Sequence, residues 1–353
     1  MSAILCRLGV MSLVLAFPSA ASAQRPPIID MHLHARAAAY AGADPPAMCT
    51  PFEIMPRSDP ARGIYEGMTM NRAPCENPVP AATTDEQVLR ETIAAMERLN
   101  IYGVVSGEPD RMAAWTAAAP DRIMPAVDYR LPGTPGSRHV GVRTLDELRR
   151  LHAQGRLTVI GEIMAQYEGV PFDDPRMGPL WALAEELDVP VAVHVGPGEP
   201  GQPYSGGGYR VALGDPLSLE PVLVRHPRLR VSVMHAGYPL ADRMRALLFS
   251  YPHIYVDIGG IVYTEPTPVF HAFLRELVEA GYGDRIMFGS DQMIWPGVIE
   301  AAVRIIEAAP FLDEAQKRDI FYNNAARFLR LSPERIAAHH RGRGASNGSR
   351  SAD

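Results

Sequence analysis

Residues 28–34 are Ile-Ile-Asp-Met-His-Leu-His, a short apolar run that carries two histidines two positions apart. Alternate side chains of a β-strand point to the same face, so His32 and His34 lie side by side if this segment is a strand. Two imidazoles on one face form a chelating pair for a metal ion. The segment therefore predicts a strand whose carboxyl end carries metal ligands.

A short run rich in Val and Ile followed by a segment of helical period recurs along most of the chain. We expect eight strands, over residues 28–33, 102–106, 122–128, 158–163, 190–195, 230–234, 253–258 and 285–288. We expect helices over residues 84–99, 145–153, 177–187, 217–225, 240–249, 269–280, 298–308 and 313–331.

This alternation predicts an α/β fold, a (β/α)₈ TIM barrel over residues 24–331, with a long first βα loop and an extra C-terminal helix. An open doubly wound sheet is disfavoured, because no G-x-G-x-x-G motif follows the first strand.

Composition excludes several classes of function. The 353 residues are 47% hydrophobic, enough to bury a large core, and the net charge of −6 gives no basic surface for nucleic acid. Lys317 is the one lysine of the chain. A phosphate-binding P-loop, a pyridoxal Schiff base and a metal bridge made of carboxylated lysine are therefore disfavoured.

The two ends of the chain differ from its middle. Residues 1–23 predict a cleaved signal peptide, with Arg7, an apolar run over 8–17 and a small-x-small pattern ending at Ala23. We therefore expect export, to the periplasm or outside the cell, and no membrane span in the mature protein. An uncleaved anchor is the alternative, although the apolar run is only about half the length that a spanning helix needs. Residues 332–353, rich in Arg, Gly, Ser and His, predict a disordered tail.

Removal of the signal peptide would leave two cysteines, Cys49 and Cys75, both in the Pro-rich loop over residues 35–83. In an oxidising compartment such a pair is expected to form a disulfide. Two free buried thiols are the alternative.

Polar residues that can bind metal end five of the predicted strands. The first carries His32 and His34, and the others are followed or ended by Glu162, His194, His235 and Asp291. The carboxyl ends of the strands form the catalytic face of a TIM barrel. Imidazole and carboxylate ligands predict one or two divalent ions, Zn²⁺ first, with Mn²⁺ and Fe²⁺ as substitutes.

Such a metal lowers the pKa of a bound water and so supplies a nucleophile. Asp291 is the expected acceptor of the proton of that water. His235 is either a ligand or the group that polarises the substrate oxygen. Glu162 bridges two ions, coordinates one, or orients a ligand.

The chain resembles the amidohydrolase superfamily, specifically its amidohydrolase-related (amidohydrolase 2) branch. The resemblance covers residues 28 to about 331 and rests on Asp30-x-His32-x-His34, Gly161-Glu162, His194, His235-Ala-Gly-Tyr-Pro239, Gly289-Ser-Asp291 and Asn323-Asn324-Ala-x-x-Phe328.

It implies that His32, His34, His194 and Asp291 are metal ligands and that His235 is a second-metal ligand or a catalytic group. Many hydrolases of the superfamily bridge two metals with a carboxylated lysine on the fourth strand, where this chain has Glu162. Some members use glutamate there, so a two-metal site stays open.

The resulting hypothesis is a metal-dependent hydrolase of an amide, ester, lactone or related bond in a small molecule. A carboxy-lyase acting on an aromatic or enolic acid is the alternative on the same scaffold. A barrel that binds a ligand without turnover is disfavoured, because neither the ligands nor the acid/base group is missing. Arg36, Tyr238 and Trp295 directly follow strand ends and are expected to contact substrate. A homo-oligomer is compatible with the sequence.

Overall fold

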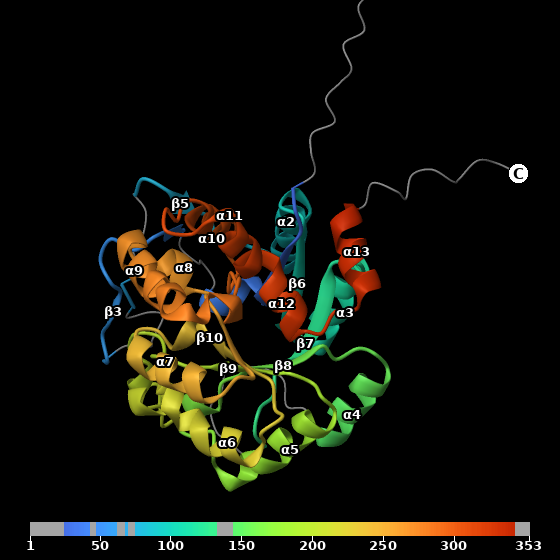
Figure 1. Cartoon of the computed structure of the whole chain (residues 1–353). Helices are drawn as coiled ribbons and strands as arrows, with labels where there is room; N and C mark the ends of the chain where they lie inside the picture. The colour runs from blue at the N-terminus through green and yellow to red at the C-terminus, as the bar shows by residue number, and fades with distance from the viewer. Residues whose placement is uncertain (1–24, 43–46, 62–67, 70–74, 133–143, 343–353) are drawn as a thin grey trace, which may run out of the picture.

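The computed structural model describes residues 25–42, 47–61, 68–69, 75–132 and 144–342. Its centre is a parallel sheet of eight strands in the order β1-β6-β7-β8-β9-β10-β11-β12 (Figure 1). The strands are β1 Ile28–Ala35, β6 Ile101–Gly107, β7 Ile123–Val127, β8 Val159–Ile163, β9 Val191–His194, β10 Val231–Met234, β11 Ile254–Asp257 and β12 Ile286–Met287. The predicted signal peptide lies outside the described residues.

The first and last strands close the sheet. Met31 N–H donates to the carbonyl of Phe288 at 2.9 Å, and Asp291 N–H donates to that of His32 at 2.7 Å. Figure 1 shows the helices arranged around the strands. The predicted α/β barrel is therefore confirmed.

Eight helices follow the strands and cover the outside of the barrel. They are α2 Asp85–Arg98, α3 Pro109–Ala118, α4 Leu145–Ala153, α5 Gly178–Glu186, α6 Glu220–Arg225, α7 Ala241–Ser250, α9 Thr267–Leu277 and α10 Gly297–Glu307, with the short α8 Ile261–Thr264 between β11 and α9. The sequence analysis identified all of the eight except α3. Nowhere in the described ranges does a helix combine the length and apolar composition needed to cross a bilayer.

A shift in strand pairing decides which side chains of β1 face the barrel interior. The register of β1 against β6 shifts between Asp30 and Leu33. As a result Ile29 and Met31 pack in the interior cluster, whereas His32 meets the other polar side chains at the carboxyl end. The same strand thus contributes to the core at one end and to the site at the other.

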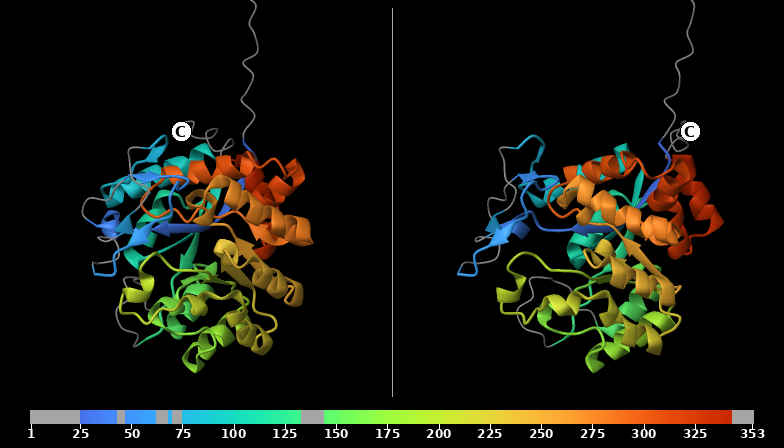
Figure 2. Two further views of the ribbon diagram at one scale, coloured as in Figure 1. Left: turned by 90° about the vertical axis from the view of Figure 1, so that its left-hand side faces the viewer. Right: turned by 60° about the vertical axis from the view of Figure 1, so that its left-hand side comes forward.

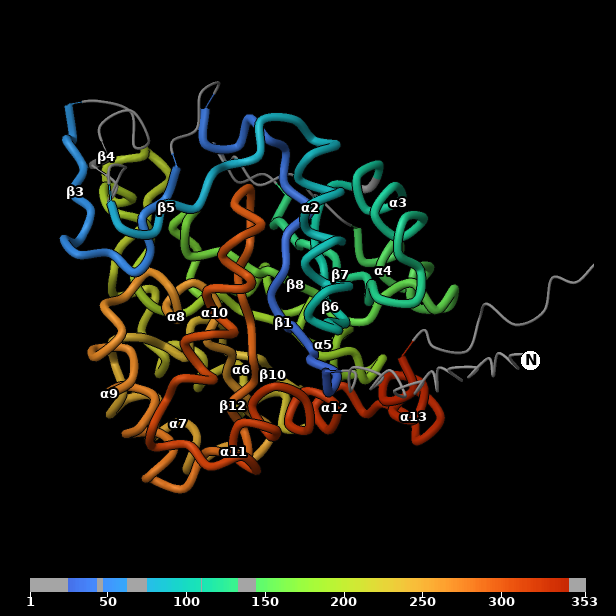
Figure 3. Tube along the Cα trace, turned by 90° about the horizontal axis from the view of Figure 1, so that it is seen from above, coloured from blue at the N-terminus to red at the C-terminus, as the bar shows by residue number. Residues whose placement is uncertain are grey.

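Residues 322–328 fill the end of the barrel at which the strands begin. This floor consists of Tyr322, Ala325, Ala326 and Phe328, which pack with the interior residues of the strands. The segment predicted as one helix over 313–331 is divided into α11 Glu314–Arg318, a π-helical turn over Asp319–Asn323, and α12 Asn324–Phe328. In the figures α12 and α13 lie far from the small strand β3 (Figures 1 and 3).

The structure differs from the predicted disordered tail at residues 333–341, which form α13 Pro333–Arg341. The Ser332 hydroxyl caps this helix by accepting from Arg335 N–H at 3.2 Å. His339 is buried, stacks on Tyr102 with ring centroids 3.7 Å apart, and lies 3.0 Å through Nδ1 from the Tyr322 hydroxyl. Burial, together with nearby Arg335, lowers the pKa of His339 to about 4, so its neutral form holds the helix in place. Residues 343–353 lie outside the described part of the chain.

The long first βα segment forms one wall at the carboxyl end of the barrel. It contains the short strands β2 Met48–Cys49, β3 Arg57–Ser58, β4 Met68–Thr69 and β5 Pro78–Val79, paired as β2 with β5 and β3 with β4. Figure 2 shows this segment, in blue, projecting from the barrel on the side away from the red C-terminal helices. Phe52 N–H donates to the carbonyl of Thr264 at 2.9 Å and so ties the segment to the region after β11.

A disulfide joins Cys49 and Cys75 across this segment, which confirms the predicted pair. Because Cys49 is almost completely buried, its sulfur is shielded from solvent reductants. We expect thiol titration of the denatured, unreduced protein that begins at Gln24 to detect no free thiol. The same protein after reduction should give two, and two thiols before reduction would contradict the pairing.

Candidate functional site

Six potential metal-binding side chains meet at the carboxyl end of the barrel. They are His32 and His34 of β1, Glu162 of β8, His194 of β9, His235 directly after β10 and Asp291 after β12. The structure therefore brings together all six of the predicted candidates for the metal site. His32 and His34 share β1, and each of the other four lies at the end of a strand of its own. The barrel therefore makes neighbours of residues that are up to 259 positions apart in the chain.

The first cluster consists of His32, His34 and Asp291. Asp291 Oδ1 lies 3.4 Å from His32 Nε2 and 3.2 Å from His34 Nε2. Within the described residues, these three atoms are buried and have no hydrogen-bond partner. Buried polar atoms without partners are costly, and a cation among two imidazole nitrogens and a carboxylate oxygen would satisfy all three.

The second cluster consists of Glu162, His194 and His235. Glu162 Oε1 lies 2.7 Å from His194 Nδ1 and 3.8 Å from His235 Nε2, and these two nitrogens are 3.0 Å apart. His235 Nδ1 lies 2.8 Å from the carbonyl of Gly259. In a neutral ring Nδ1 must carry the proton to donate there, which leaves the Nε2 lone pair free to bind a metal.

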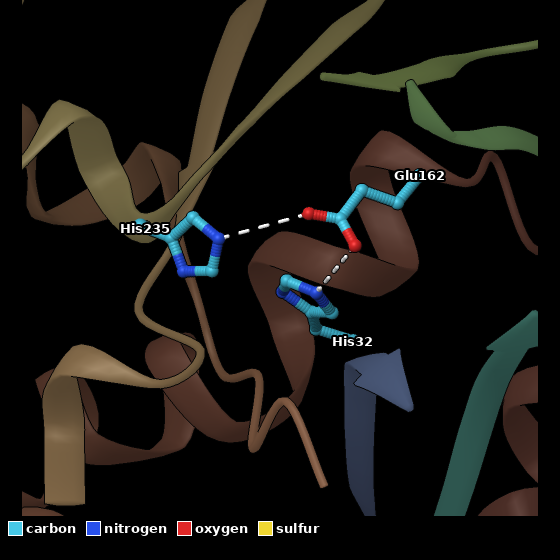
Figure 4. A group of neighbouring side chains, drawn as sticks. All are labelled: His32, Glu162 and His235. Atoms are coloured by element: carbon cyan, nitrogen blue, oxygen red, sulfur yellow. Dashed lines mark ion pairs between the residues drawn. The ribbon is translucent and has the colours of Figure 1, made fainter. Parts of the chain in front are cut away.

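Glu162 connects the two clusters. Its Oε2 lies 3.8 Å from His32 Nε2 and 3.4 Å from His34 Nε2, while its Oε1 faces the second cluster. Figure 4 shows the carboxylate between the rings of His32 and His235, with one oxygen toward each. One carboxylate with its two oxygens toward two separate pairs of nitrogens has the geometry of a bridging ligand.

The electrostatics keep both carboxylates charged. Burial alone would raise the pKa of Glu162, but the hydrogen bond from His194 and the nearby rings of His235 and His32 hold it well below its usual value. Burial acts on Asp291 in the same way, and the neighbouring His32 and His34 lower its pKa. Burial and the adjacent His235 lower the pKa of His194, which favours its neutral, metal-binding form.

A second set of polar residues, which was not predicted from the sequence, orients these ligands. Asp257 Oδ1 lies 3.2 Å from His32 Nδ1, and Ser106 Oγ lies 3.0 Å from His34 Nδ1. In each ring this contact holds Nδ1, so that Nε2 points toward the site. Asp128 Oδ1 accepts from Glu162 N–H at 2.9 Å. These three residues lie at or beside the carboxyl ends of the remaining strands β6, β7 and β11, so the signal was the same as for the predicted ligands.

The strands approach one another closely beneath this site. A Cβ at Gly259 would lie 2.6 Å from His32 Nδ1, so only glycine leaves room for the ring that Asp257 orients. Asp30 Oδ1 accepts from the N–H groups of His32 and Ser290, both at 3.0 Å. This carboxylate therefore fixes the backbone of the first strand against the segment that carries Asp291.

A cavity of about 430 Å³ is lined by four of the six side chains, Glu162, His194, His235 and Asp291. Two of the three predicted substrate contacts, Arg36 and Tyr238, line it, and the Tyr238 hydroxyl donates to Glu265 at 2.8 Å. Trp295 is buried in the hydrophobic core and is not among the described residues that line this cavity. The prediction that Trp295 contacts substrate therefore gains no support.

The hydroxyl of Tyr167 lies 3.1 Å from His194 Nε2, and Tyr167 also lines the cavity. Burial raises the pKa of Tyr167 well above its ordinary value, so its hydroxyl keeps its proton. It therefore donates to, or is positioned by, the outer nitrogen of His194. The sequence offered no signal for this residue, because it lies after β8 in a short 3₁₀ turn, Ala165–Glu168.

Comparison with known proteins gives a consistent result. Residues 29–331 match the family model described as Amidohydrolase. The protein fluG of Emericella nidulans is 22% identical over 173 residues, which span 44% of this chain but only 20% of that protein.

Two solved structures have the same fold. An uncharacterised TIM-barrel protein from Bordetella bronchiseptica is 19% identical, with a TM-score of 0.55 over 88% of this chain and 100% of that one. A probable 2-pyrone-4,6-dicarboxylic acid hydrolase from Acinetobacter baumannii is 16% identical, with a TM-score of 0.56 over 86% and 99% of the two chains. The family model covers most of the sequence and its barrel fold is the one described above, so the chain belongs to the amidohydrolase family.

Proposed function

We propose that this protein is a metal-dependent hydrolase that acts on an amide, ester, lactone or related bond of a small molecule. The observation that carries the proposal is the convergence of His32 Nε2, His34 Nε2 and Asp291 Oδ1, all buried and without a hydrogen-bond partner among the described residues. The family match and the cavity lined by Asp291 and the neighbouring Glu162 support it.

The donor set fits two divalent ions. His32, His34 and Asp291 would hold one, His194 and His235 the other, and Glu162 would contact both through its separate oxygens. Imidazole nitrogens and carboxylate oxygens favour Zn²⁺, with Mn²⁺ and Fe²⁺ able to replace it.

The residues around the cavity then have separate tasks. A divalent cation bound here supplies acidification of water and polarisation of a substrate oxygen. Asp291 accepts the proton of the attacking water, since its carboxylate is ionised and its Oδ1 faces the interior of the site. His235 serves as a ligand, because its Nδ1 is engaged by the Gly259 carbonyl and its Nε2 faces Glu162. Phe52, Met55 and Ile261 give this end of the barrel an apolar part of its lining.

The proposal is tested by metal content and by the fate of water oxygen. We expect the purified protein to contain up to two divalent ions per chain and to lose turnover on chelation, with recovery when metal is restored. Turnover of an ester, lactone, amide and carboxylic-acid panel in ¹⁸O-labelled water should place the label in the product. Full activity without bound metal would refute the proposal. Release of CO₂ together with an organic product that carries no label would instead identify the alternative, a carboxy-lyase acting on an aromatic or enolic acid.

We also propose that the protein acts after export, in the periplasm or outside the cell. The signal-like residues 1–23 and the disulfide between Cys49 and Cys75 support this location, since such bonds persist in oxidising compartments. Localisation of a full-length fusion, with a variant lacking residues 1–23 as control, tests it. Equal retention of both proteins in the cytoplasm would refute it.

A further inference from the structure

Arg36 lies at the edge of the cavity, two residues beyond His34. Its side chain is about nine-tenths buried, with 9% relative exposure, and it lines the cavity together with Glu162 and Asp291. It is the one arginine or lysine among the described residues that line this cavity. A buried cation at such a place must be balanced by an anion.

The described residues satisfy the guanidinium only in part. Nε and Nη2 of Arg36 are buried and have no hydrogen-bond partner among them. Nη1 lies 3.6 Å from Asp128 Oδ2, too far for a hydrogen bond, and the group lies over the ring of Tyr40 at 5.4 Å. Most N–H groups of the planar guanidinium, whose spacing suits the two oxygens of a carboxylate or similar group, therefore have no acceptor among the described residues.

A purely structural task for Arg36 does not account for this arrangement. If Arg36 served to neutralise the carboxylates of the site, it should contact them. Between the described side chains, Arg36 makes no ion pair within 4.0 Å with either Glu162 or Asp291, and its one ion pair is the long contact with Asp128. Both site carboxylates face histidines instead.

The rest of the cavity indicates how the ligand is built. Its walls include the apolar side chains of Phe52, Met164 and Met293, which suit an apolar body. Glu199 and Glu265 also line it, and they would repel a second anionic group. Arg36 is thus the one cationic side chain among the described lining residues, and the two acids disfavour a second negative charge on the ligand.

We propose that Arg36 is a specificity-determining residue, which binds one anionic oxygen substituent, such as a carboxylate, on an otherwise apolar substrate. The inference rests on the proposed function, because it assigns the substrate class of the same site. Asp128 acts as a positioning residue, since it contacts Arg36 through Oδ2 and the backbone of Glu162 through Oδ1.

The test uses fluorine NMR titration of the metal-loaded protein with the isosteric pair 4-fluorobenzoate and 4-fluorobenzamide. The wild type should bind the benzoate at least about tenfold more tightly than the benzamide, as expected for charge-assisted hydrogen bonds. A third probe, 5-fluoroisophthalate, carries a second carboxylate and should bind more weakly than 4-fluorobenzoate.

Arg36→Gln should remove the preference for benzoate and leave benzamide binding unchanged. Arg36→Lys, which keeps the charge without the fork, should retain part of it and covers the case in which the glutamine variant does not fold. The matched control is Arg130→Gln: Arg130 pairs with Glu168 at 2.9 Å and is not among the described residues that line the cavity. This control should behave as the wild type.

Equal binding of the two probes by the wild type, or an unchanged preference in Arg36→Gln, would overturn the inference. Metal content measured on the same samples reports separately on the proposed function. A metal-free wild type that still prefers benzoate through Arg36 would contradict the proposed function but support the assignment of Arg36.

Discussion

Replacing Asp291 by asparagine is expected to lower turnover by about 10³-fold, with much less change in the apparent affinity for substrate. The amide keeps the size of the carboxylate, but it cannot accept a proton from water and is a weaker metal ligand. The wild-type carboxylate is ionised because the neighbouring His32 and His34 outweigh the effect of burial on its pKa. The loss should therefore appear in kcat and not in KM.

The measurement is steady-state kinetics on the substrate found with the panel, with metal content determined in parallel. Asp242→Asn is a suitable control, because the Asp242 side chain is 94% exposed and is not among the described residues that line the cavity. An Asp291→Asn enzyme with wild-type turnover would contradict the assignment of Asp291 as the proton acceptor.

Replacing Glu162 by glutamine is expected to reduce bound metal from about two ions per chain to one or fewer, and activity by about 10- to 100-fold. The physical reason is the position of the carboxylate, whose Oε1 faces His194 and His235 while its Oε2 faces His32 and His34. The neutral amide of glutamine has only one oxygen that can bind a metal, so it cannot act as a ligand in both clusters.

Elemental analysis after gel filtration gives the stoichiometry, and Glu314→Gln, at a side chain that is 91% exposed, is the matched control. If the wild type holds two ions and the glutamine variant keeps both, Glu162 is not a bridge. If the wild type holds a single ion that the variant binds 10- to 100-fold more weakly, Glu162 acts on one ion, and the two-ion arrangement is wrong.

The sequence was sufficient for the barrel and for the six side chains at its catalytic end. The reason is that a parallel barrel places the carboxyl ends of all strands at one face. Local patterns such as Asp30-x-His32-x-His34 therefore predict which side chains come together there. The same rule applied to β6, β7 and β11 would have found Ser106, Asp128 and Asp257 as well. Their contacts with other side chains, however, are long-range and have no local signal.

Elements that depend on tertiary contact were missed. Helix α3 begins two residues after β6 ends, is rich in alanine and has only a short apolar stripe, with Met112 and Trp115 buried. Its pattern is too weak to identify without the sheet that it covers. Helix α13 lies in a segment of polar composition, but its cap at Ser332 and the burial of His339 against Tyr102 stabilise it.

The prediction for Trp295 failed to gain support for a related reason. Proximity to a strand end places a residue near the catalytic face but does not determine whether its side chain turns toward the cavity or toward the helices. Arg36 and Tyr238 turn toward the cavity, whereas Trp295 packs in the core.

The floor of the barrel has a consequence for folding during protein synthesis. Tyr322 and Phe328, which seal the interior cluster that contains Met31 and Tyr102, leave the ribosome after all eight strands of the barrel. A nascent chain that has already produced every strand still exposes the underside of its core to water, because the residues that cover it are not yet available. Completion of the barrel must therefore wait until this segment has been synthesised, and a chain that stops short of it is left with an apolar opening that chaperones and proteases recognise.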